Sequence, residues 1–420
     1  MSDKQLESIF MKDPALKESY TRLGVAKAYD GGERRSVLSD KALLEVAKGD
    51  AALNVDMRLA RSLIPLKSLT DSHLAELVRN SESEIVFRDQ VLFEAGTYDR
   101  EHIYLLHGEV ELQHANGERQ LLRGANCLRP MAHSQPRPCR AVARSDCSVL
   151  RVKSEYLDKI LTWSQVAEYM LLDIAYQRDL DEDAEWMMTI LKSNLFHKVP
   201  PINAQMIFDR LQTMVVEAGE AVLRQGEIGN NCYFIREGEA EVRQSPDGMT
   251  PPVRVAEIGP GRCFGEDALV NETVRNASVI MNTDGVLMYL SKRDFLKLLK
   301  EPKVDVAEAA EVPERVAAGA ICIDVRTEEE YESGHLDRAI NLPLNLLRIK
   351  TRLLNKYTPY ILYCDTGRRS RAAAHLLARA GYQALALEGG LRGLQPAEGV
   401  NLATSTAEFL LKDGELVAGE

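Results

Sequence analysis

Two short stretches, VLFEAG at residues 91–96 and AVLRQG at residues 221–226, share one pattern and decide the fold of most of this chain. Each stretch is an apolar run that ends at a glycine. Each is followed at the same spacing by a second run, IYLLHGEVEL at 103–112 and YFIREGEAEV at 233–242, so the two copies lie 130 residues apart. Short apolar runs punctuated by glycine are typical of many-stranded β structures. The sequence therefore predicts two tandem β-roll modules with flanking helices.

The patterns outside the two modules divide the rest of the chain. Apolar residues at helical spacing follow the first module and end in an acidic run at 179–185, which predicts a connecting helix with a solvated acidic face. After the second module, apolar strands at 321–325 and 360–363 alternate with a helix at 369–381, as in a small parallel α/β domain. The predicted fold class is therefore multidomain, with α+β modules and a final α/β domain. The expected divisions are a partly helical lead-in (1–61), a first module (62–160), a connecting helix (161–194), a second module (195–300), a linker with one helix (301–318), the α/β domain (319–400) and a tail (401–420).

The composition excludes several classes of protein. The 420 residues include 52 Lys and Arg against 63 Asp and Glu, a net charge of −11, which argues against whole-chain binding to nucleic acid or an anionic membrane. The seven cysteines are odd in number and include no C-x-x-C pair, which favours a reducing compartment. The N-terminus has no apolar leader and no stretch is long enough to span a membrane, so a cytoplasmic protein is expected.

The second module contains a segment suited to an anion. GRCFGEDALV at residues 261–270 is followed by an arginine at position 275. Gly265 lets backbone amides approach an anion, a short helix that begins near Glu266 points free N–H groups at it, and Arg275 adds a charged fork. The Glu266 carboxylate can accept hydrogen bonds from a sugar hydroxyl. If only the glutamate and the arginine are considered, the alternative to an anion site is a salt bridge between them on a turn.

FGEDAL at residues 264–269, Arg275 and the upstream run GEAVLRQG at 219–226 together resemble the cyclic nucleotide-binding domain. The resemblance covers about 195–300. It implies that Glu266 holds the ribose 2′-hydroxyl and that Arg275 holds the cyclic phosphate. It also implies backbone amide donors at Gly265, Ala268 and Asn276. The implied ligand is a cyclic nucleotide, cAMP or cGMP, and the alternative is a retained fold without a ligand.

The first module lacks the same segment. Its equivalent, residues 124–141, has no FGE tripeptide, and an offset that has grown to about 138 puts Leu128 opposite Glu266. Arg137 can still lie opposite Arg275, but there is no sugar acceptor, and three prolines remove or stiffen amide donors. We therefore expect a degenerate module with a structural, dimerisation or signal-relaying role. Ligand binding through a different anion contact is the alternative.

The C-terminal domain carries a candidate nucleophile. CDTGRRS at residues 364–370 lies between an apolar strand and a helix, which would place Cys364 at the base of a bowl of amides beside Arg368 and Arg369. Amide donors and guanidinium groups stabilise a thiolate, so the pattern predicts a lowered pKa for Cys364. The alternative for a lone cysteine at a strand end is a buried, inert thiol.

Further motifs surround this loop. They are DVR at 324–326, EEYESGHL at 329–336, AINLP at 339–343 and LEGG at 387–390. Together with C-x-x-G-x-R-S from Cys364 to Ser370, the series resembles a single-domain rhodanese over about 310–400. His335 is expected to be a structural hydrogen-bonding residue rather than a general base.

The rhodanese resemblance implies covalent catalysis by an activated thiolate. Cys364 would carry sulfane sulfur as a persulfide, the amides of 365–369 would hold it, and Arg369 and Ser370 would fix the loop. The site residues so implied are Cys364, Gly367, Arg368, Arg369 and Ser370. The C-x4-R spacing suits sulfur transfer, whereas related phosphatases use C-x5-R to enclose a larger phosphate. A phosphatase is therefore the less favoured chemistry.

The sequence thus predicts a cyclic-nucleotide-regulated sulfurtransferase. We expect the nucleotide to reorder the helix at 291–299 and so to alter access to Cys364. No metal and no further cofactor is expected. The expected partners are a cyclic nucleotide, a small sulfur donor and a thiol or cyanide acceptor, without nucleic acid or membrane and with a homodimer left open. The alternative is a non-catalytic cyclic-nucleotide-binding protein for signalling or redox sensing. A transcription factor is disfavoured because DNA-binding relatives place a helix-turn-helix where the linker and rhodanese stand here.

Overall fold

The computed structural model of the chain describes residues 55–177, 199–394, 404–405, 409–412 and 415–418. It divides into two compact units, Met1–Val152 and Lys153–Glu420. Most of the expected lead-in (1–61) and the acidic run at 179–185 lie outside the described residues. Within the described residues, no helix is both long and apolar enough to cross a membrane.

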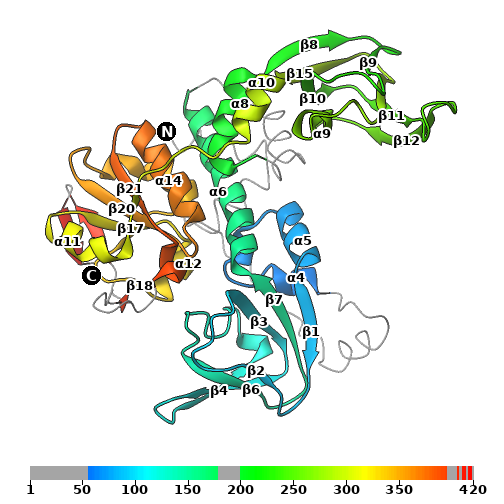
Figure 1. The fold of residues 1–420 in the computed structure, drawn as a ribbon. Helices are drawn as coiled ribbons and strands as arrows, with labels where there is room; N and C mark the ends of the chain where they lie inside the picture. The colour runs from blue at the N-terminus through cyan, green and yellow to red at the C-terminus, as the bar shows by residue number, and fades with distance from the viewer. Residues whose placement is uncertain (1–54, 178–198, 395–403, 406–408, 413–414, 419–420) are drawn as a thin grey trace, which may run out of the picture. The chain divides into compact units, whose positions relative to one another are not determined.

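The first unit is a β roll preceded by short helices (Figure 1). The helical segments are α4 (Met57–Ala60), η1 (Leu66–Ser68), α5 (Asp71–Arg79) and η2 (Gly124–Asn126). One sheet has the order β1 (Glu82–Val86), β7 (Cys147–Lys153) and β3 (Glu101–His107). The other has the order β2 (Val91–Phe93), β6 (Cys139–Ala143), β4 (Glu109–His114) and β5 (Arg119–Arg123). Apolar side chains between the sheets, such as Ile103, Leu105 and Val149, are fully buried and form the core.

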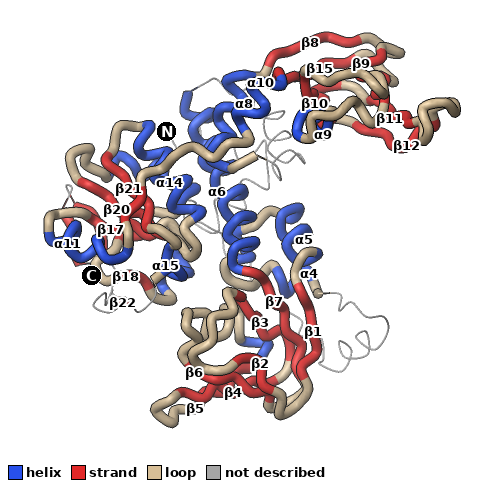
Figure 2. Tube along the Cα trace, viewed as in Figure 1, coloured by secondary structure: helices blue, strands red, loops and turns tan. Residues whose placement is uncertain are grey.

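The second β roll repeats this plan within the second unit, as the strands in Figure 2 show. One sheet has the order β13 (Cys263–Phe264), β10 (Asn231–Glu237), β15 (Gly285–Ser291) and β8 (Gln212–Val216). The other has the order β12 (Val253–Ile258), β11 (Ala240–Gln244), β14 (Ser278–Met281) and β9 (Ala221–Leu223). The flanking helical segments are η4 (Pro201–Asn203), α8 (Ala204–Arg210), α9 (Glu266–Val270) and α10 (Lys292–Leu298).

Backbone hydrogen bonds confirm that the two modules are copies of one another. Gly96 N donates to Arg137 O at 2.8 Å, and Gly226 N donates to Arg275 O at 2.8 Å. In each copy the arginine N–H in turn donates to the carbonyl of the residue after that glycine, at 2.9 and 2.8 Å. The predicted equivalence of Arg137 and Arg275 is therefore correct at the level of the backbone.

The connecting helix is α6, which runs over Ser154–Gln177, a stretch without glycine or proline. It begins in the last residues of the predicted first module (62–160) and continues into the predicted connecting helix (161–194). Residues 178–198 lie outside the described residues. Most of the helix is apolar, but Asp158 is buried on it with only 2% of its surface exposed. A carboxylate buried on an apolar helix requires a compensating partner.

The C-terminal part is an α/β domain, as predicted. Its parallel sheet has the order β16 (Val306–Ala307), β21 (Gln383–Leu387), β20 (Pro359–Tyr363), β17 (Ile321–Asp324) and β19 (Ile340–Asn341). The helical segments are η5 (Ala309–Glu311), α11 (Val312–Ala317), α12 (Glu328–Glu332), η6 (Leu344–Leu346), α13 (Leu347–Lys350), η7 (Thr351–Leu353), α14 (Arg368–Arg379) and α15 (Gly390–Gly393). Two short antiparallel pairs complete it: β18 (His335–Leu336) with β22 (Thr404–Ser405), and β23 (Phe409–Lys412) with β24 (Glu415–Ala418).

Much of the expected linker at 301–318 belongs to this domain instead. Val306 and Ala307 form the edge strand β16 beside β21, and Val312 of α11 is buried in the domain core. The charged, alanine-rich composition suggested a linker because a two-residue strand and a six-residue helix leave most of their residues exposed.

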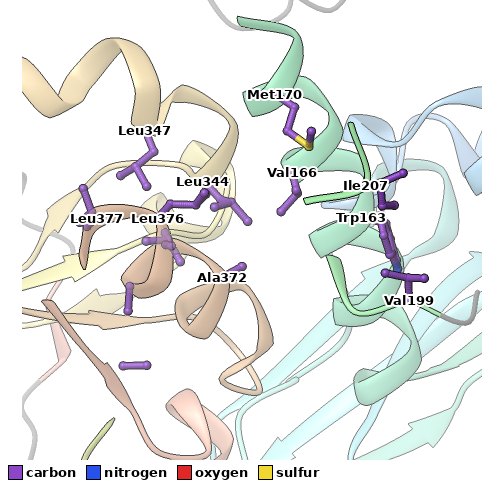
Figure 3. Close-up of a cluster of buried hydrophobic side chains, with 14 of the residues drawn as sticks. Trp163, Val166, Met170, Val199, Ile207, Leu344, Leu347, Ala372, Leu376 and Leu377 are labelled. Carbon is purple, nitrogen blue, oxygen red and sulfur yellow. The ribbon is translucent and has the colours of Figure 1, made fainter. Parts of the chain in front are cut away.

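One apolar cluster joins α6 to both neighbours within the second unit (Figure 3). Trp163 of α6 lies beside Val199 and Ile207, which flank the start of the second β roll. α6 also packs against η6 and α14 of the α/β domain, whose buried side chains include Leu344 and Leu376. The helix therefore packs against both the helices that flank the second β roll and the α/β domain.

Candidate functional sites

The FGE segment of the second module forms a tight turn into α9. Gly265 precedes the helix with φ 83°, a left-handed conformation that favours glycine. A Cβ at this position would lie 2.9 Å from the Nη1 atom of Arg275, so the glycine also permits a close approach. Glu266 and Ala268 on α9 are buried, with 6% and 7% of their surface exposed. The turn thus places the predicted sugar acceptor inside the module, next to the predicted phosphate ligand.

Arg275 is buried beside this turn, with 4% of its surface exposed. Its guanidinium donates to the carbonyl oxygens of Gly265 and Asn231, the second at 2.6 Å. Burial lowers the pKa of Arg275, although a guanidinium stays charged at neutral pH. Because carbonyl oxygens carry no net charge, Arg275 keeps a full positive charge that can meet an anion.

The remaining predicted donor, Asn276, follows Arg275 on the surface. Its side chain is exposed and its carbonyl accepts a hydrogen bond from Gln244 at 3.2 Å. The structure therefore brings Gly265, Glu266, Ala268 and Arg275 together and leaves Asn276 at the rim.

In the first module, the equivalent arginine has a carboxylate partner of its own. Arg137 is 1% exposed and donates to both oxygens of Asp99, at 2.9 and 2.8 Å. It also donates to the carbonyls of Glu101, Met131 and Ala132. Burial acts to raise the pKa of Asp99, but the hydrogen bond and charge of Arg137 outweigh it, so that pKa is lowered.

The offset of 130 residues places Gly229 opposite Asp99 in the second module. A Cβ at position 229 would overlap the guanidinium of Arg275. Where the first module has a carboxylate on its arginine, the second therefore has a glycine whose backbone packs against the guanidinium and brings no carboxylate to it. The Asp99–Arg137 ion pair is therefore a second difference between the modules, beside the missing glutamate opposite Glu266.

The cysteine loop lies between β20 and α14, as predicted. Cys364 follows the last residue of β20, and Gly367 caps α14 with φ 95°. The backbone N–H of Gly367 donates to Cys364 Sγ at 3.1 Å, and Ser370 Oγ lies 3.8 Å from the same sulfur. Gly390 packs so closely that a Cβ there would lie 2.6 Å from the Cys364 carbonyl oxygen. The loop is therefore tightly held around the sulfur.

Arg369 lies in this loop with 1% of its surface exposed. It donates to both oxygens of Glu330, at 2.7 and 2.8 Å, and its Nε donates to Asp158. Burial acts to raise the pKa of Glu330, but Arg369 overrides it and holds that pKa at about 2. Glu330 was not among the predicted site residues, although it lies within the EEYESGHL stretch that carried the resemblance.

Asp158 is the residue that sequence reasoning missed altogether. Its Oδ2 atom lies 3.3 Å from Cys364 Sγ and accepts hydrogen bonds from the hydroxyl and the backbone N–H of Thr366, at 2.5 and 3.3 Å. Asp158 is one of four acids along this helix, so the sequence pattern alone does not single it out. Its partners are more than 200 residues away in the sequence.

The predicted lowering of the Cys364 pKa is wrong. The thiol is fully buried, and burial together with the negative charge of Asp158 raises its pKa to about 12, against the opposing effect of Arg369. The prediction counted the positive groups of the loop itself. It missed the desolvation of the sulfur and the carboxylate supplied by α6.

The other charged groups of the loop are also paired. Arg368 donates to Glu155 of α6 at 2.9 Å, and Arg392 donates to Asp365 at 2.7 Å. His335 is buried, donates from Nδ1 to the Tyr331 carbonyl at 2.9 Å and stacks on the Tyr331 ring. That position agrees with the structural role predicted for His335.

Comparisons with known proteins agree with this division of the chain. The model of the cyclic nucleotide-binding domain matches residues 86–162 and 213–301, and the model of the rhodanese-like domain matches residues 308–397. The cAMP-dependent protein kinase regulatory subunit of Schizosaccharomyces pombe is 39% identical over 137 residues, 31% of this chain and 32% of that protein. Its counterpart in Eremothecium gossypii is 28% identical over 240 residues, 56% of this chain and 48% of that protein.

The matches therefore span about a third and about half of these two regulatory subunits. Among solved structures, the regulatory domain of Toxoplasma gondii PKA with cAMP is 19% identical, with a TM-score of 0.22 over 62% of this chain and 94% of that one. The chain is thus a fusion of two cyclic nucleotide-binding domains with a C-terminal rhodanese-like domain.

Proposed function

We propose that this chain is a cyclic-nucleotide-regulated sulfurtransferase that carries sulfane sulfur as a persulfide on Cys364. The observation that supports this chemistry best is the tight C-x4-R loop, in which the Gly367 amide donates to Cys364 Sγ at 3.1 Å. Such an amide stabilises a sulfur anion, and the short loop favours a single sulfur over a phosphate group. In this proposal Arg368, Arg369 and Ser370 hold the loop.

The proposed reaction has two steps with thiosulfate and cyanide as probes. The Cys364 thiolate attacks the sulfane sulfur of thiosulfate, a new S–S bond forms on Cys364, and the S–S bond of thiosulfate breaks as sulfite leaves with the electron pair. Cyanide then attacks the outer sulfur of the persulfide, and thiocyanate leaves while the Cys364 thiolate is restored. No external oxidant or reductant is needed.

The proposed regulatory ligand binds the second module. There Arg275 would meet the cyclic phosphate and Glu266 the ribose, with amides of Gly265, Ala268 and Asn276 around them. The similarity to cAMP-dependent kinase regulatory subunits favours cAMP as the first ligand to test, with cGMP as the comparison. The first module, whose arginine already has a carboxylate partner, is proposed to act in structure, dimerisation or relay.

A contact route supports coupling between the two sites. Asn203 donates from its side chain to the carbonyls of Leu298 and Lys300, at 2.7 and 2.8 Å, and so ties η4 to the end of α10. η4 packs against α6, and α6 carries Asp158 to the Cys364 loop. A nucleotide that shifts α10, as the sequence predicted, would therefore act on the cysteine through α6.

Thiocyanate formation by the full chain tests this proposal. We expect turnover that is lost in Cys364→Ser, retained in Cys322→Ser, and changed by saturating cAMP. Cys322 is a suitable control because it is also buried but lies on β17, away from the loop. Turnover that survives Cys364→Ser would refute the catalytic role, and identical rates with and without nucleotide would refute the regulation.

The burial of Cys364 specifically favours one other function, a non-catalytic sensor of redox state or persulfide. That function predicts no thiocyanate from the wild-type chain under any nucleotide condition, together with cAMP binding to the second module. For either function we place the protein in a reducing cytoplasm, because all seven cysteines are free.

A further inference from the structure

Besides the thiol of Cys364, the buried carboxylate of α6 meets three hydrogen-bond donors of the cysteine loop. They are the backbone N–H of Thr366, its hydroxyl and the Nε of Arg369. Thr366 lies between β20 and α14, and Arg369 lies in the first turn of α14. A hydroxyl, an amide and a guanidinium that converge on one point form a site for a small anion. In this structure the anion in that site is Asp158.

The position of Asp158 is also the position that a sulfur donor needs. Its Oδ2 atom is 3.3 Å from Cys364 Sγ, within the range at which reacting atoms approach one another. Cys364 has none of its surface exposed, and Asp158 has 2%. A donor therefore cannot reach the sulfur while α6 stays in place.

We propose that Asp158 is an internal anionic ligand that closes the Cys364 loop. The loop takes a small anionic sulfur donor, such as thiosulfate, only after α6 withdraws the carboxylate. This proposal rests on the proposed sulfurtransferase function and adds the residue through which access is controlled.

The surrounding charges allow the carboxylate to leave. Glu330 holds two N–H groups of Arg369, so the buried guanidinium stays paired when Asp158 departs. A charge that kept no partner after such a move would oppose it strongly. The departing carboxylate regains water, and the three donors are then free for an incoming anion.

Other charged side chains of α6 also contact the α/β domain. Glu155 pairs with the half-exposed Arg368, and Asp173 pairs with Arg348 at 2.5 Å. Trp163 on the same helix packs near Val199 and Ile207 beside the second cyclic nucleotide-binding domain (Figure 3). A shift there would move Asp158, which is five residues before Trp163.

The test compares three variants of the full chain with the wild type. Asp158→Asn keeps the shape and an acceptor oxygen, Asp158→Ala removes the side chain, and Asp173→Asn removes a different α6 carboxylate that does not touch the loop. Two rates are measured, each with and without saturating cAMP: alkylation of Cys364 by iodoacetamide, followed by peptide mass spectrometry, and thiocyanate formation from thiosulfate and cyanide. Thermal unfolding checks that each variant is folded, and Asp158→Asn serves if Asp158→Ala does not fold.

We expect both Asp158 variants to raise Cys364 alkylation by about tenfold or more, the usual effect of removing a like charge beside a titrating group. Thiocyanate formation should rise with it and lose its response to cAMP, while Asp173→Asn behaves as the wild type. If the wild type turns over as fast as both Asp158 variants, the closing role is refuted and the sulfurtransferase function stands. If alkylation rises but no variant forms thiocyanate, Asp158 does close the loop and the proposed function is wrong.

Discussion

The pH dependence of Cys364 alkylation is the most direct measure of how Asp158 acts on the thiol. With a pKa of about 12, Cys364 is ionised to only about one part in 10⁴ at pH 8. A cysteine with the ordinary value of 9.0 would be about one tenth ionised at that pH. Since the thiolate is the reactive form, wild-type Cys364 should react about a thousandfold more slowly than an unperturbed thiol, even before steric protection is counted.

Asp158→Asn removes a negative charge 3.3 Å from the sulfur. The carboxylate opposes a second negative charge nearby, so its loss stabilises the thiolate and lowers the pKa of Cys364. A like charge at this distance usually shifts a pKa by about one to three units, which corresponds to a rate increase of about 10-fold to 1,000-fold. Burial persists in the variant, so its pKa should stay above that of an exposed cysteine.

The assay follows iodoacetamide labelling of the full chain from pH 6 to pH 9.5, with quenched samples read by peptide mass spectrometry. The wild-type rate should rise about tenfold per pH unit without a plateau, and the Asp158→Asn profile should run parallel above it. Cys322, whose pKa burial alone raises to about 11, should label equally slowly in both proteins. A wild-type plateau near pH 7, or superimposable profiles, would refute the electrostatic role of Asp158.

Three other substitutions test the remaining sites. Gly229→Asp should place a carboxylate beside Arg275, as Asp99 does beside Arg137, and should abolish cAMP binding measured by calorimetry. The control is Gly259→Asp, where a side chain would meet open space, and it should bind cAMP as the wild type does. Asp99→Ala should lower the free energy of unfolding, measured by urea titration, by about 3 kcal/mol, because it leaves Arg137 charged and buried without its carboxylate. The double variant Asp99→Ala with Arg137→Met removes that charge. If the single variant loses less unfolding free energy than the double variant, this reasoning is wrong. Glu330→Gln should remove a pH dependence of stability. In the wild type this carboxylate stabilises the fold fully above pH 4.5, and about 3 kcal/mol of that stability is lost as the pH falls towards 2. The unfolding free energies of the two proteins should therefore differ at neutral pH and become equal in acid.

The parts of this molecule that were predictable from sequence are those whose partners lie close along the chain. The Cys364 loop follows from a strand, a glycine in the left-handed region and a helix, all within a few residues. The Gly265 turn and Arg275 are equally local, since they lie within one segment of the second module. Internal repetition then extended the prediction, because the same glycine spacing and the same arginine occur in both copies.

The parts that could not be predicted depend on distant contacts. The sign of the Cys364 pKa shift is set by burial and by Asp158, which precedes it by 206 residues. Nothing in the local pattern of α6 tells a buried acid from a solvated one. The linker prediction was wrong for a related reason, because Val306 and Ala307 form strand β16 only through their pairing with β21, which is distant in the sequence. In each instance the missing information was tertiary.

The contrast between Asp99 and Gly229 also bears on how such a chain can evolve. Aspartate and glycine codons differ by a single base, so a carboxylate on the arginine of a nucleotide module is one mutation away from being gained or lost. Duplication of a module followed by that change would leave one copy responsive and give the other a permanent internal counter-ion. The copy with the internal counter-ion, here the first module, could then change at its sugar-contacting position without loss of folding, as Leu128 opposite Glu266 illustrates. Tandem arrays can in this way separate a receptor from a scaffold while keeping one fold.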